Sequence, residues 1–479
     1  PRLSLAFFPR NDKERVVTEP TTSCPFTLSS RGRSPWRSTV NQQAKRQTHP
    51  RPFKARWIAA SLAPFSPRND KGWGVILSDG RVSSLYHLHL FRFNLKMKLH
   101  LVLFPLCFLC LNFLHGADRK VTIIHKQGQF GCHTFRIPAM ATTNKGTLLA
   151  VYDMRYRSRR DLQGHMDIGL SRSTDGGETW ARSIPIMDMK KFGGLPEDQN
   201  GCSDPNILID RKTGEIFVSA VWTHGKPNTH QWRGKGSEPG HSIHKSSQFM
   251  IVRSTDDGLT WSEPENWTKR LKDPTWHLFA PAPGNGITLK NGMLVMPTQG
   301  RDKTGLPFSN LMWSRDHGKS WTVSKQARDN TTECAVVELS DGSLMLNMRD
   351  NRNRSDKSKS NGRAVGVTKN LGKSWAVHSS DHGALPEPVC MASLISHDLA
   401  DGRRVLFFSN PNSKHRREKM TVRMSLDQGK SWPKSILLDQ KGGAYSSLTM
   451  VDDQTIGILY ESSVADMVFQ KIQLSEFGL

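Results

Sequence analysis

The sequence predicts an all-β fold, a six-bladed β-propeller whose hairpin turns carry a repeated motif. Two internal repeats predict it. The first is Ser/Thr-x-Asp-x-Gly-x-Thr/Ser-Trp, here called the Asp-box. Asp-boxes end at Trp180, Trp261, Trp321 and Trp432, and a fifth copy ending at Trp375 has Asn in place of Asp. The second repeat is a Gly or Asp turn followed by an apolar segment, and it occurs six times. Repeats of this kind, rich in β-formers and Trp, are typical of propellers.

The Asp-box has the composition of a hairpin corner. Its Asp or Asn side chain can accept hydrogen bonds from backbone amides two residues further on, and its Gly supplies the positive φ of a tight reversal. The Trp ring is then buried against the neighbouring strands. Each copy follows a short apolar segment, such as residues 249–253. The motif is therefore interpreted as a structural turn without a part in chemistry.

Each unit is expected to contain four antiparallel strands, two around the Gly turn and two around the Asp-box. The six Gly-turn segments read NKGTLLAVYDMR, KTGEIFVSAVW, KNGMLVMPTQG, SDGSLMLNMRD, ADGRRVLFFSNP and DDQTIGILYES, in chain order. The sixth unit has no Asp-box. A strand over residues 121–125 is expected to complete that unit and close the ring.

Strand parity places a candidate site at one end of the propeller. Because antiparallel strands alternate in direction, both turns of a blade lie at the same end. The starts of the first strands and the ends of the second strands meet at the other end, where polar groups from five blades would converge. These residues are Arg136, Arg155, Asp161, Asp204, Trp222, Glu333, Arg349, Arg417, Tyr445 and Glu461. Three arginines gathered around an axis favour an anionic ligand, and the Arg fork matches a carboxylate.

The front of the chain differs from the rest. The 479-residue chain has a net charge of +24, and residues 1–96 hold 17 Lys and Arg against 5 Asp and Glu. This stretch has no periodic pattern, so we expect it to be disordered or to be upstream sequence translated from a wrong start. A basic nucleic-acid-binding arm is the alternative, for which charge alone is weak evidence.

Residues 97–117 read MKLHLVLFPLCFLCLNFLHGA, a basic start followed by an apolar core. This pattern predicts a secretory signal peptide rather than a membrane span, and hence a secreted, periplasmic or cell-surface protein. Residues 118–479 are then the propeller domain. Its cysteines, Cys132, Cys202, Cys334 and Cys390, show no zinc-site spacing; they form disulfides or remain as core thiols.

Several segments of the propeller resemble a known family. They are FRIP at 135–138, TTECAVVE, LNMRDNR and GGAYSSL, in this order, together with the Asp-boxes. With them, residues from about 121 to 477 resemble the bacterial and animal exo-α-sialidases (neuraminidases). The resemblance implies that Arg136, Arg349 and Arg417 bind the sialic acid carboxylate. It also implies Tyr445 as nucleophile, Glu333 as its base, Asp161 as acid/base, Glu461 orienting Arg136, and Arg155 and Asp204 lining the pocket near O4 of the sugar.

The chemistry of these residue types agrees with the implied roles. A neutral phenol approaches an anomeric carbon that bears a carboxylate without the repulsion that a carboxylate nucleophile would meet. The phenol has an ordinary pKa of about 10, so it needs a nearby base. Sialidases with a Tyr nucleophile depart in this way from the common two-carboxylate scheme.

The sequence thus predicts a monomeric exo-α-sialidase that releases terminal α-linked sialic acid from glycoproteins, glycolipids and oligosaccharides with retention. It predicts no cofactor, metal, nucleic-acid partner or membrane span. A trans-sialidase and a non-catalytic sugar-binding propeller are the alternatives, since propellers host many functions. The full set of Tyr445, Glu333 and Asp161 separates enzyme from lectin, because a lectin has no need of it.

Overall fold

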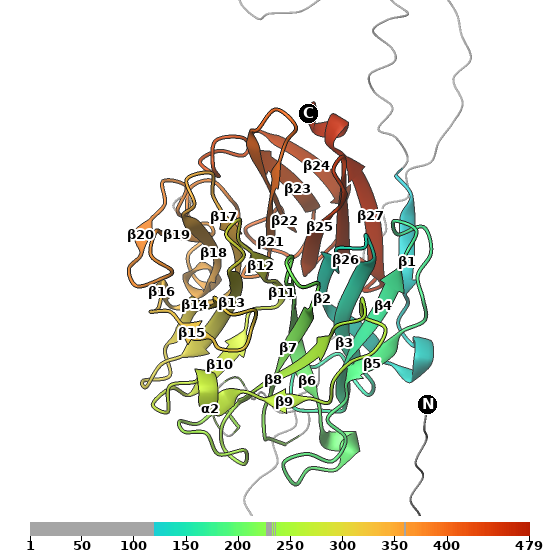
Figure 1. Cartoon of the computed structure of the whole chain (residues 1–479), viewed down its shortest axis with the longest axis vertical. Helices are drawn as coiled ribbons and strands as arrows, with labels where there is room; N and C mark the ends of the chain where they lie inside the picture. Colours follow the sequence, from blue (N-terminus) through green and yellow to red (C-terminus); the bar gives the residue numbers. More distant parts are fainter. Residues whose placement is uncertain (1–118, 227–231, 233, 235, 359–360) are drawn as a thin grey trace, which may run out of the picture. The chain divides into compact units, whose positions relative to one another are not determined.

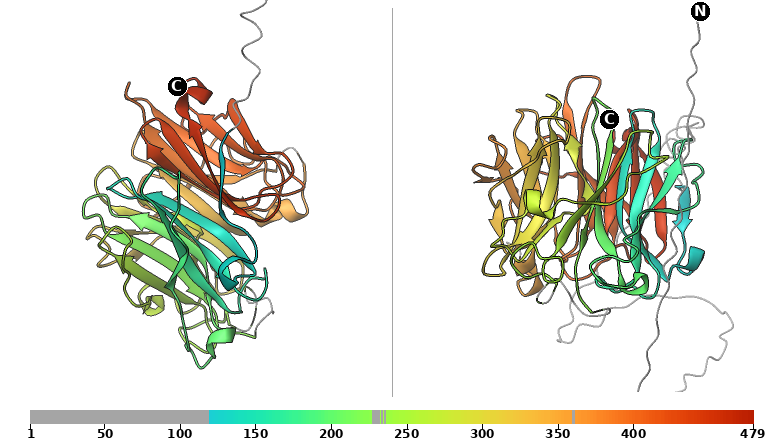
Figure 2. Two further views of the ribbon diagram at one scale, coloured as in Figure 1. Left: turned by 90° about the vertical axis from the view of Figure 1, so that its right-hand side faces the viewer. Right: turned by 60° about the horizontal axis from the view of Figure 1, so that its bottom comes forward.

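The computed structural model describes residues 119–479, except 227–231, 233, 235 and 359–360. Their strands form six sheets arranged around a central axis, which confirms the six-bladed propeller (Figure 1). Figure 2 shows the strands of neighbouring blades standing side by side. The predictions for residues 1–96 and for the signal peptide at 97–117 fall outside the described residues.

Blades one to three are built from consecutive segments of the chain. Blade one contains β2 (Thr134–Thr142), β3 (Leu148–Arg155), β4 (Met166–Ser173) and β5 (Ile184–Met187). Blade two contains β6 (Cys202–Ile209), β7 (Ile216–Trp222), β8 (Gln248–Ser254) and β9 (Glu265–Asn266), with β11 (Gly284–Asn285) parallel to β6. Blade three contains β10 (Leu278–Pro281), β13 (Leu294–Arg301), β14 (Pro307–Ser314) and β15 (Thr322–Val323), with β12 (Ile287–Thr288) and β16 (Arg328–Asp329) added.

Blades four to six follow the same plan. Blade four contains β17 (Thr331–Glu338), β18 (Leu344–Asp350), β19 (Ala364–Thr368) and β20 (Ala376–Val377). Blade five contains β21 (Ser393–Asp398), β22 (Arg404–Pro411), β23 (Met420–Ser425) and β24 (Lys434–Asp439). Blade six contains β25 (Ser446–Asp452), β26 (Thr455–Glu461) and β27 (Met467–Gln473). A short helix, α2 (Thr268–Leu271), and 3₁₀ turns at 129–131, 197–199, 351–354 and 474–477 complete the described elements.

The ring closes as the sequence predicts. The N-terminal strand β1 (Val121–His125) pairs antiparallel with β27 and forms the outer strand of blade six. The inner strands also meet in a ring, since β2 contacts β6 on one side and β25 on the other. Blade six is therefore built from both ends of the propeller segment.

The hydrophobic core lies between the blades. Six clusters of buried apolar side chains each join two neighbouring blades, including one between blades one and six. Because neighbouring blades cover both faces of a blade, its second strand is almost entirely buried; every residue of β3 and of β7 is buried. This explains why these strands read as continuous apolar runs rather than as alternating patterns.

The Asp-boxes are turns, with one difference from the prediction. In the box at 254–261, the Asp256 carboxylate accepts hydrogen bonds from the amide of Thr260, four residues on, at 2.9 Å, and from the Thr260 hydroxyl. The Ser254 hydroxyl accepts from the amide of Gly258 at 3.0 Å. The other boxes repeat this pattern, the Asn-containing copy at 368–375 included. The side chain thus spans a longer loop than the two-residue reach expected.

Three first strands carry a β-bulge near the end away from the Asp-boxes. The register shifts between Arg136 and Ala139 in β2, in β6 just after Ser203, and in β17 just after Thr331. A bulge bends a strand and redirects its side chains, and bulges are common beside active sites. In the bulges of β2 and β6, one residue has a positive φ: Ile137 (58°) in β2 and Asp204 (61°) in β6.

The four cysteines of the described segment, Cys132, Cys202, Cys334 and Cys390, are buried free thiols. Of the two alternatives left open, the structure therefore has core thiols. Among residues 119–479 as described, no helix has the length and apolarity needed to cross a membrane.

Gly177 is expected to be the least replaceable glycine of the first Asp-box. It has φ +87°, and a Cβ built on it would lie 2.2 Å from the Phe469 ring of blade six. Gly176 has φ +69°, but its nearest neighbour, Val451, would be 3.7 Å from the added Cβ. Both substitutions to Ala incur backbone strain, while overpacking adds about 1–3 kcal/mol at Gly177 alone. Chemical denaturation should show Gly177→Ala to be the more destabilised by about that amount; equal losses would contradict this packing.

Asp167 is expected to make stability depend on pH. It is 5% exposed on β4 and accepts a hydrogen bond from the Tyr156 hydroxyl at 2.6 Å. Burial raises its pKa to about 7, with Asp188 and Glu197 adding to the rise and the Tyr156 bond opposing it. Since the folded pKa lies above the unfolded value of about 4, the folded state loses stability as the pH rises from about 4 to about 7.

The substitution Asp167→Asn removes this titration and can still accept the Tyr156 hydrogen bond. At about 1.4 kcal/mol per pKa unit, the variant should be more stable than the parent at pH 8 by at most about 4 kcal/mol. At pH 4 the two proteins should be equally stable. Denaturation curves at both pH values test this, with Asp198→Asn, an exposed carboxylate paired with Arg157, as control. An equal shift at both pH values would contradict the assignment.

Candidate active site

A cavity of about 280 Å³ opens where strand parity placed the site; here it is called the inner cavity. It lies at the end of the blades opposite to the Asp-boxes. Its lining comes from every blade, through the starts of first strands, the ends of second strands and the loops beyond them. The lining residues include Arg136, Asp161, Asp204, Gln299, Arg301, Glu333, Arg349, Arg354, Arg417 and Tyr445.

At the inner end of this cavity, Tyr445, Glu333 and Arg349 form one hydrogen-bonded group. The Tyr445 hydroxyl donates to Glu333 Oε1. Arg349 Nη1 donates to Glu333 Oε2 at 2.5 Å and to the Tyr445 oxygen at 3.0 Å. Both contacts use Nη1, so neither engages Nη2 of the same fork. The tyrosine precedes β25, and its partners come from β17 and β18, so the group joins blades four and six across the axis.

Tyr445 is held as a neutral phenol. Its side chain is buried, and burial raises its pKa well above the ordinary value. The Glu333 charge raises the pKa further, whereas Arg349 and Arg417 oppose the rise. The phenol therefore keeps its proton at neutral pH, and Glu333 stands at the oxygen to receive that proton if Tyr445 attacks an electrophile.

Three arginines surround the tyrosine. The Arg136 and Arg417 guanidinium carbons lie 5.6 Å and 5.4 Å from the Tyr445 ring centroid, and Arg349 contacts the hydroxyl. Arg417 is fixed by donating to the Val389 carbonyl at 3.1 Å, and the adjacent Arg416 does not border the cavity. Three positive forks facing one space suit an anionic ligand such as a carboxylate.

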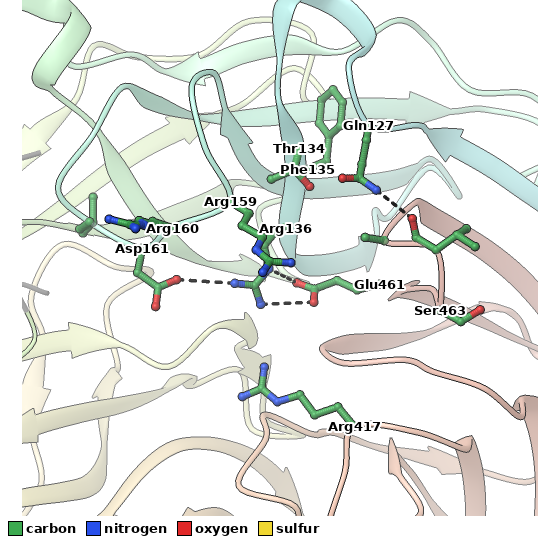
Figure 3. A pocket seen from close by; sticks show the side chains of 13 residues that line it. Gln127, Thr134, Phe135, Arg136, Arg159, Arg160, Asp161, Arg417, Glu461 and Ser463 are labelled. Carbon is green, nitrogen blue, oxygen red and sulfur yellow. Dashed lines mark hydrogen bonds and ion pairs between the residues drawn. The ribbon is translucent and has the colours of Figure 1, made fainter. Parts of the chain in front are cut away.

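Glu461 orients Arg136, as Figure 3 shows. Its Oε1 lies 3.2 Å from Arg136 Nε, and its Oε2 accepts from Nη2 at 3.3 Å. Glu461 Oε1 also accepts from the Ile137 amide at 2.9 Å, within the bulge of β2. Burial alone would lower the pKa of Arg136, but Glu461, with Tyr445 and Asp161, raises it above the ordinary value. Arg136 is therefore a permanent, positioned cation.

Arg155 differs from the expectation that it lines the pocket. It is fully buried and does not border the inner cavity. Its Nη1 donates to Asp161 Oδ1 at 2.9 Å and to the Arg159 carbonyl, while its other nitrogens bind the Asp153 carboxylate. Arg155 thus supports the loop that carries Asp161. The Asp161 side chain itself is 45% exposed at the cavity mouth, 3.6 Å from Arg136 Nη1.

Asp204 borders the inner cavity, as expected, and residues that were not predicted support it. Asp153 accepts from the Asp204 amide at 3.2 Å and from the Ser203 hydroxyl at 2.6 Å. Gln299 of blade three lies 3.5 Å from Asp204 Oδ2. Burial raises the pKa of Asp204 well above its ordinary value, and Glu333 and Asp153 add to the rise. Asp204 is therefore protonated more readily than a solvent-exposed carboxyl group.

Blade three also contributes to the site, although the sequence predicted no site residue in this blade. Gln299 and Arg301 lie at the end of its second strand and border the inner cavity. Applying the parity rule to blade three would have found both residues. Trp222, by contrast, stands at the predicted end of β7 but is fully buried in the core between blades one and two, where its indole donates to Asn200. It is a core residue and not a site residue.

The floor of the site is apolar and close to the axis. Ile137, Cys390, Met391 and Tyr445 form one buried cluster. The loop with Cys390 is held by Arg363, which donates to the Cys390 carbonyl at 2.7 Å and pairs with Glu387 at 2.5 Å; both of these charged side chains are buried. The same loop supplies the Val389 carbonyl that holds Arg417. No sequence motif pointed to this support.

The assembled groups offer a nucleophile with an adjacent base, a carboxyl group at the mouth and three forks for an anion. They match the residues required for acyl- or glycosyl-transfer chemistry at a carbon beside a carboxylate. The structure thus brings together every residue to which the sequence reading gave a catalytic or carboxylate-binding role. It moves Arg155 from the lining into the support and Trp222 from the candidate site into the core.

Comparisons with known proteins show the family to which the propeller segment belongs. The family model for a BNR repeat-like domain matches residues 141–459. The chain is 50% identical over 369 residues to a sialidase of Bacteroides fragilis, a match that covers 76% of this chain and 66% of that protein. It therefore spans just under two thirds of that relative's length. It is 30% identical over 345 residues to an exo-alpha-sialidase of Arthroderma benhamiae, covering 69% of this chain and 79% of that protein.

A solved structure is similar over the same region. The Hadza microbial sialidase Hz136 superposes with a TM-score of 0.71 at 46% sequence identity, covering 74% of this chain and 69% of that one. All of these matches cover the propeller segment. The chain belongs to the sialidase family.

Proposed function

We propose that this protein is an exo-α-sialidase that hydrolyses terminal α-linked sialic acid with retention, through a covalent bond to Tyr445. The observation that carries the proposal is the group formed by Tyr445, Glu333 and Arg349 inside a ring of arginines. A binding protein for the same anion needs the forks but not a phenol hydrogen-bonded to a buried carboxylate.

In the first step, the substrate carboxylate is drawn to Arg136, Arg349 and Arg417. The added negative charge beside Asp161 favours the protonated form of that carboxyl group. The Tyr445 oxygen bonds to the anomeric carbon and passes its proton to Glu333, while Asp161 gives its proton to the leaving oxygen as the glycosidic bond breaks. The aglycone leaves with a new hydroxyl group, and the sialyl group is bonded to the tyrosine.

In the second step, water attacks the same carbon from the side that the aglycone has left. Its proton goes to the Asp161 carboxylate, which Arg155 holds in place at 2.9 Å. The bond to Tyr445 breaks, and the phenol recovers its proton from Glu333. Two displacements at one carbon give net retention, and each acid and base returns to its starting state.

Turnover of a fluorogenic sialoside by the purified protein tests this proposal. Proton NMR should find α-sialic acid as the first product, before mutarotation; β-sialic acid appearing first would contradict a covalent intermediate. Added lactose distinguishes a trans-sialidase, which would form sialyllactose instead of free sialic acid. Binding of sialic acid without turnover of any sialoside would support the lectin alternative.

Arg349→Lys is expected to lower kcat/KM on the order of tenfold to a hundredfold. The lysine keeps the charge but loses the planar fork, and a charge-assisted pair contributes about 1.5–3 kcal/mol. Arg352→Lys is the matched control, three residues further on, because Arg352 pairs with Asp329 and Asp350 outside the cavity. Steady-state kinetics on both variants check this. Equal activity of Arg349→Lys and the parent, with an intact fold, would remove Arg349 from carboxylate binding.

A further inference from the structure

A second, larger cavity adjoins the inner cavity. It has a volume of about 810 Å³ and is called here the outer groove. It shares Arg136, Asp161 and Arg417 with the inner cavity, and Figure 3 shows these side chains facing the space. The rest of its lining includes the Asp161 loop and the turn between β26 and β27, through Arg159, Arg160, Leu162, Ser463, Val464 and Ala465.

We propose that the outer groove binds the sugar that leaves and favours one that carries a second oxyanion, either a sulfate or a carboxylate. This inference rests on the proposed function. An acid must lie within hydrogen-bond reach of the leaving oxygen. The leaving sugar therefore begins at Asp161 and extends away from Tyr445.

Two spaces border Asp161 on its outer side. The outer groove shares two arginines with the inner cavity besides Asp161, so the two spaces are continuous. A third cavity, of about 220 Å³, shares only Asp161 with the inner cavity, and its lining includes Arg157, Arg160 and Asp198. The leaving sugar is therefore assigned to the outer groove, which also has the room for it.

The positive charge of the outer groove is the reason to expect a preference for an anionic leaving sugar. Its two carboxylates are already engaged, Glu461 by Arg136 and by the Ile137 amide, and Asp161 by Arg155. Arg136 and Arg417 are assigned to the carboxylate of the sialyl unit that is transferred to Tyr445. Arg159, which is exposed and borders the outer groove but not the third cavity, then adds positive charge that a neutral sugar does not require. Guanidinium forks match the paired oxygens of sulfate and carboxylate groups.

The test compares three substrates. They are 3′-sialyllactose, the same glycan with a sulfate on its galactose, and an α2,8-disialyl glycan whose leaving sugar is itself a sialic acid. The variant Arg159→Gln is compared with the parent, and Arg157→Gln is the matched control from the same loop. Arg157 pairs with Asp198 and does not border the outer groove.

The Arg159→Gln variant should lose about tenfold or more in kcat/KM on a substrate with an anionic leaving sugar, the size of a lost charge-assisted contact. It should change less than about twofold on 3′-sialyllactose, and the loss should shrink at 0.5 M NaCl because exposed charges are screened. A loss confined to the sulfated glycan assigns sulfate as the preferred group, and a loss confined to the disialyl glycan assigns carboxylate.

Equal losses on neutral and anionic leaving sugars would overturn the inference, as would no loss on either anionic substrate. A loss in Arg157→Gln of the same size would place the leaving sugar in the third cavity and also overturn it. Turnover of 3′-sialyllactose by the parent keeps the two proposals separate. If no sialoside is turned over, the proposed function fails; if turnover shows no charge preference, only the inference about the outer groove fails.

Discussion

Tyr445→Phe is expected to lower kcat on sialosides by about 10³-fold or more, the scale seen when a nucleophile is removed from a hydrolase. The substitution deletes one oxygen and leaves the ring on which Arg136 and Arg417 stack. Binding of sialic acid should therefore persist. The melting temperature should change little, since the lost hydrogen bonds to Glu333 and Arg349 are worth about 1–3 kcal/mol together. Kinetics, calorimetric binding and thermal denaturation on one preparation measure all three.

Tyr460→Phe is the matched control for this experiment. Tyr460 is buried in β26 of the same blade, and its hydroxyl accepts from Gln470 at 2.7 Å, away from the cavity. The control loses the same oxygen and should keep its activity. A Tyr445→Phe variant that folds and hydrolyses sialosides at the parent rate would show that the phenol is not the nucleophile.

Glu333→Gln is expected to have the second-largest effect, a loss of about 10²–10⁴-fold in kcat/KM. The amide has the shape of the carboxylate but cannot take the Tyr445 proton, and it also removes the charge that pairs with Arg349 at 2.5 Å. The attacking oxygen then has no adjacent base. The same substitution leaves Arg349 unneutralised, so binding of the anionic substrate should not weaken; the loss should appear in kcat rather than in KM.

Glu338→Gln provides the comparison on the same strand. Glu338 lies at the other end of β17, where it accepts from the Lys290 amide at 2.9 Å, far along the strand from the tyrosine. It should retain parent kinetics. If Glu333→Gln instead raised KM with kcat unchanged, Glu333 would be a binding residue and the base would have to be sought elsewhere.

The fold was predictable from the sequence because its signals are local and repeated. Each Asp-box and each Gly turn marks a hairpin by itself, and counting them gives six blades with β1 completing the last. What the pattern did not reveal is the bulges. A bulge depends on how β2 or β6 is accommodated beside its neighbours, and a positive φ at Ile137, a β-branched residue, contradicts its local preference. Such a conformation is set by tertiary context.

The site was predictable where strand parity alone positions a side chain, as at Arg136, Glu333 and Arg349. The sequence did not reveal the residues that hold a site residue in place from a neighbouring blade. Asp153 lies opposite Arg136 in the pairing of β2 with β3, yet its bonds to Ser203 and Asp204 join two blades. Arg155 was expected in the pocket lining because it ends a second strand. Strand parity locates the end of a strand, but it does not tell whether a side chain there faces the cavity or the core.

The central claim is a covalent bond between the sialyl group and Tyr445, and mass spectrometry of the trapped enzyme tests it most directly. The parent protein is incubated with 3-fluorosialosyl fluoride, whose fluorine slows the release of the intermediate, and is then digested with a protease. The account predicts a fluorosialyl adduct on Tyr445, and no adduct in Tyr445→Phe. An adduct on Glu333 or Asp161, or turnover of the reagent without any adduct, would contradict it.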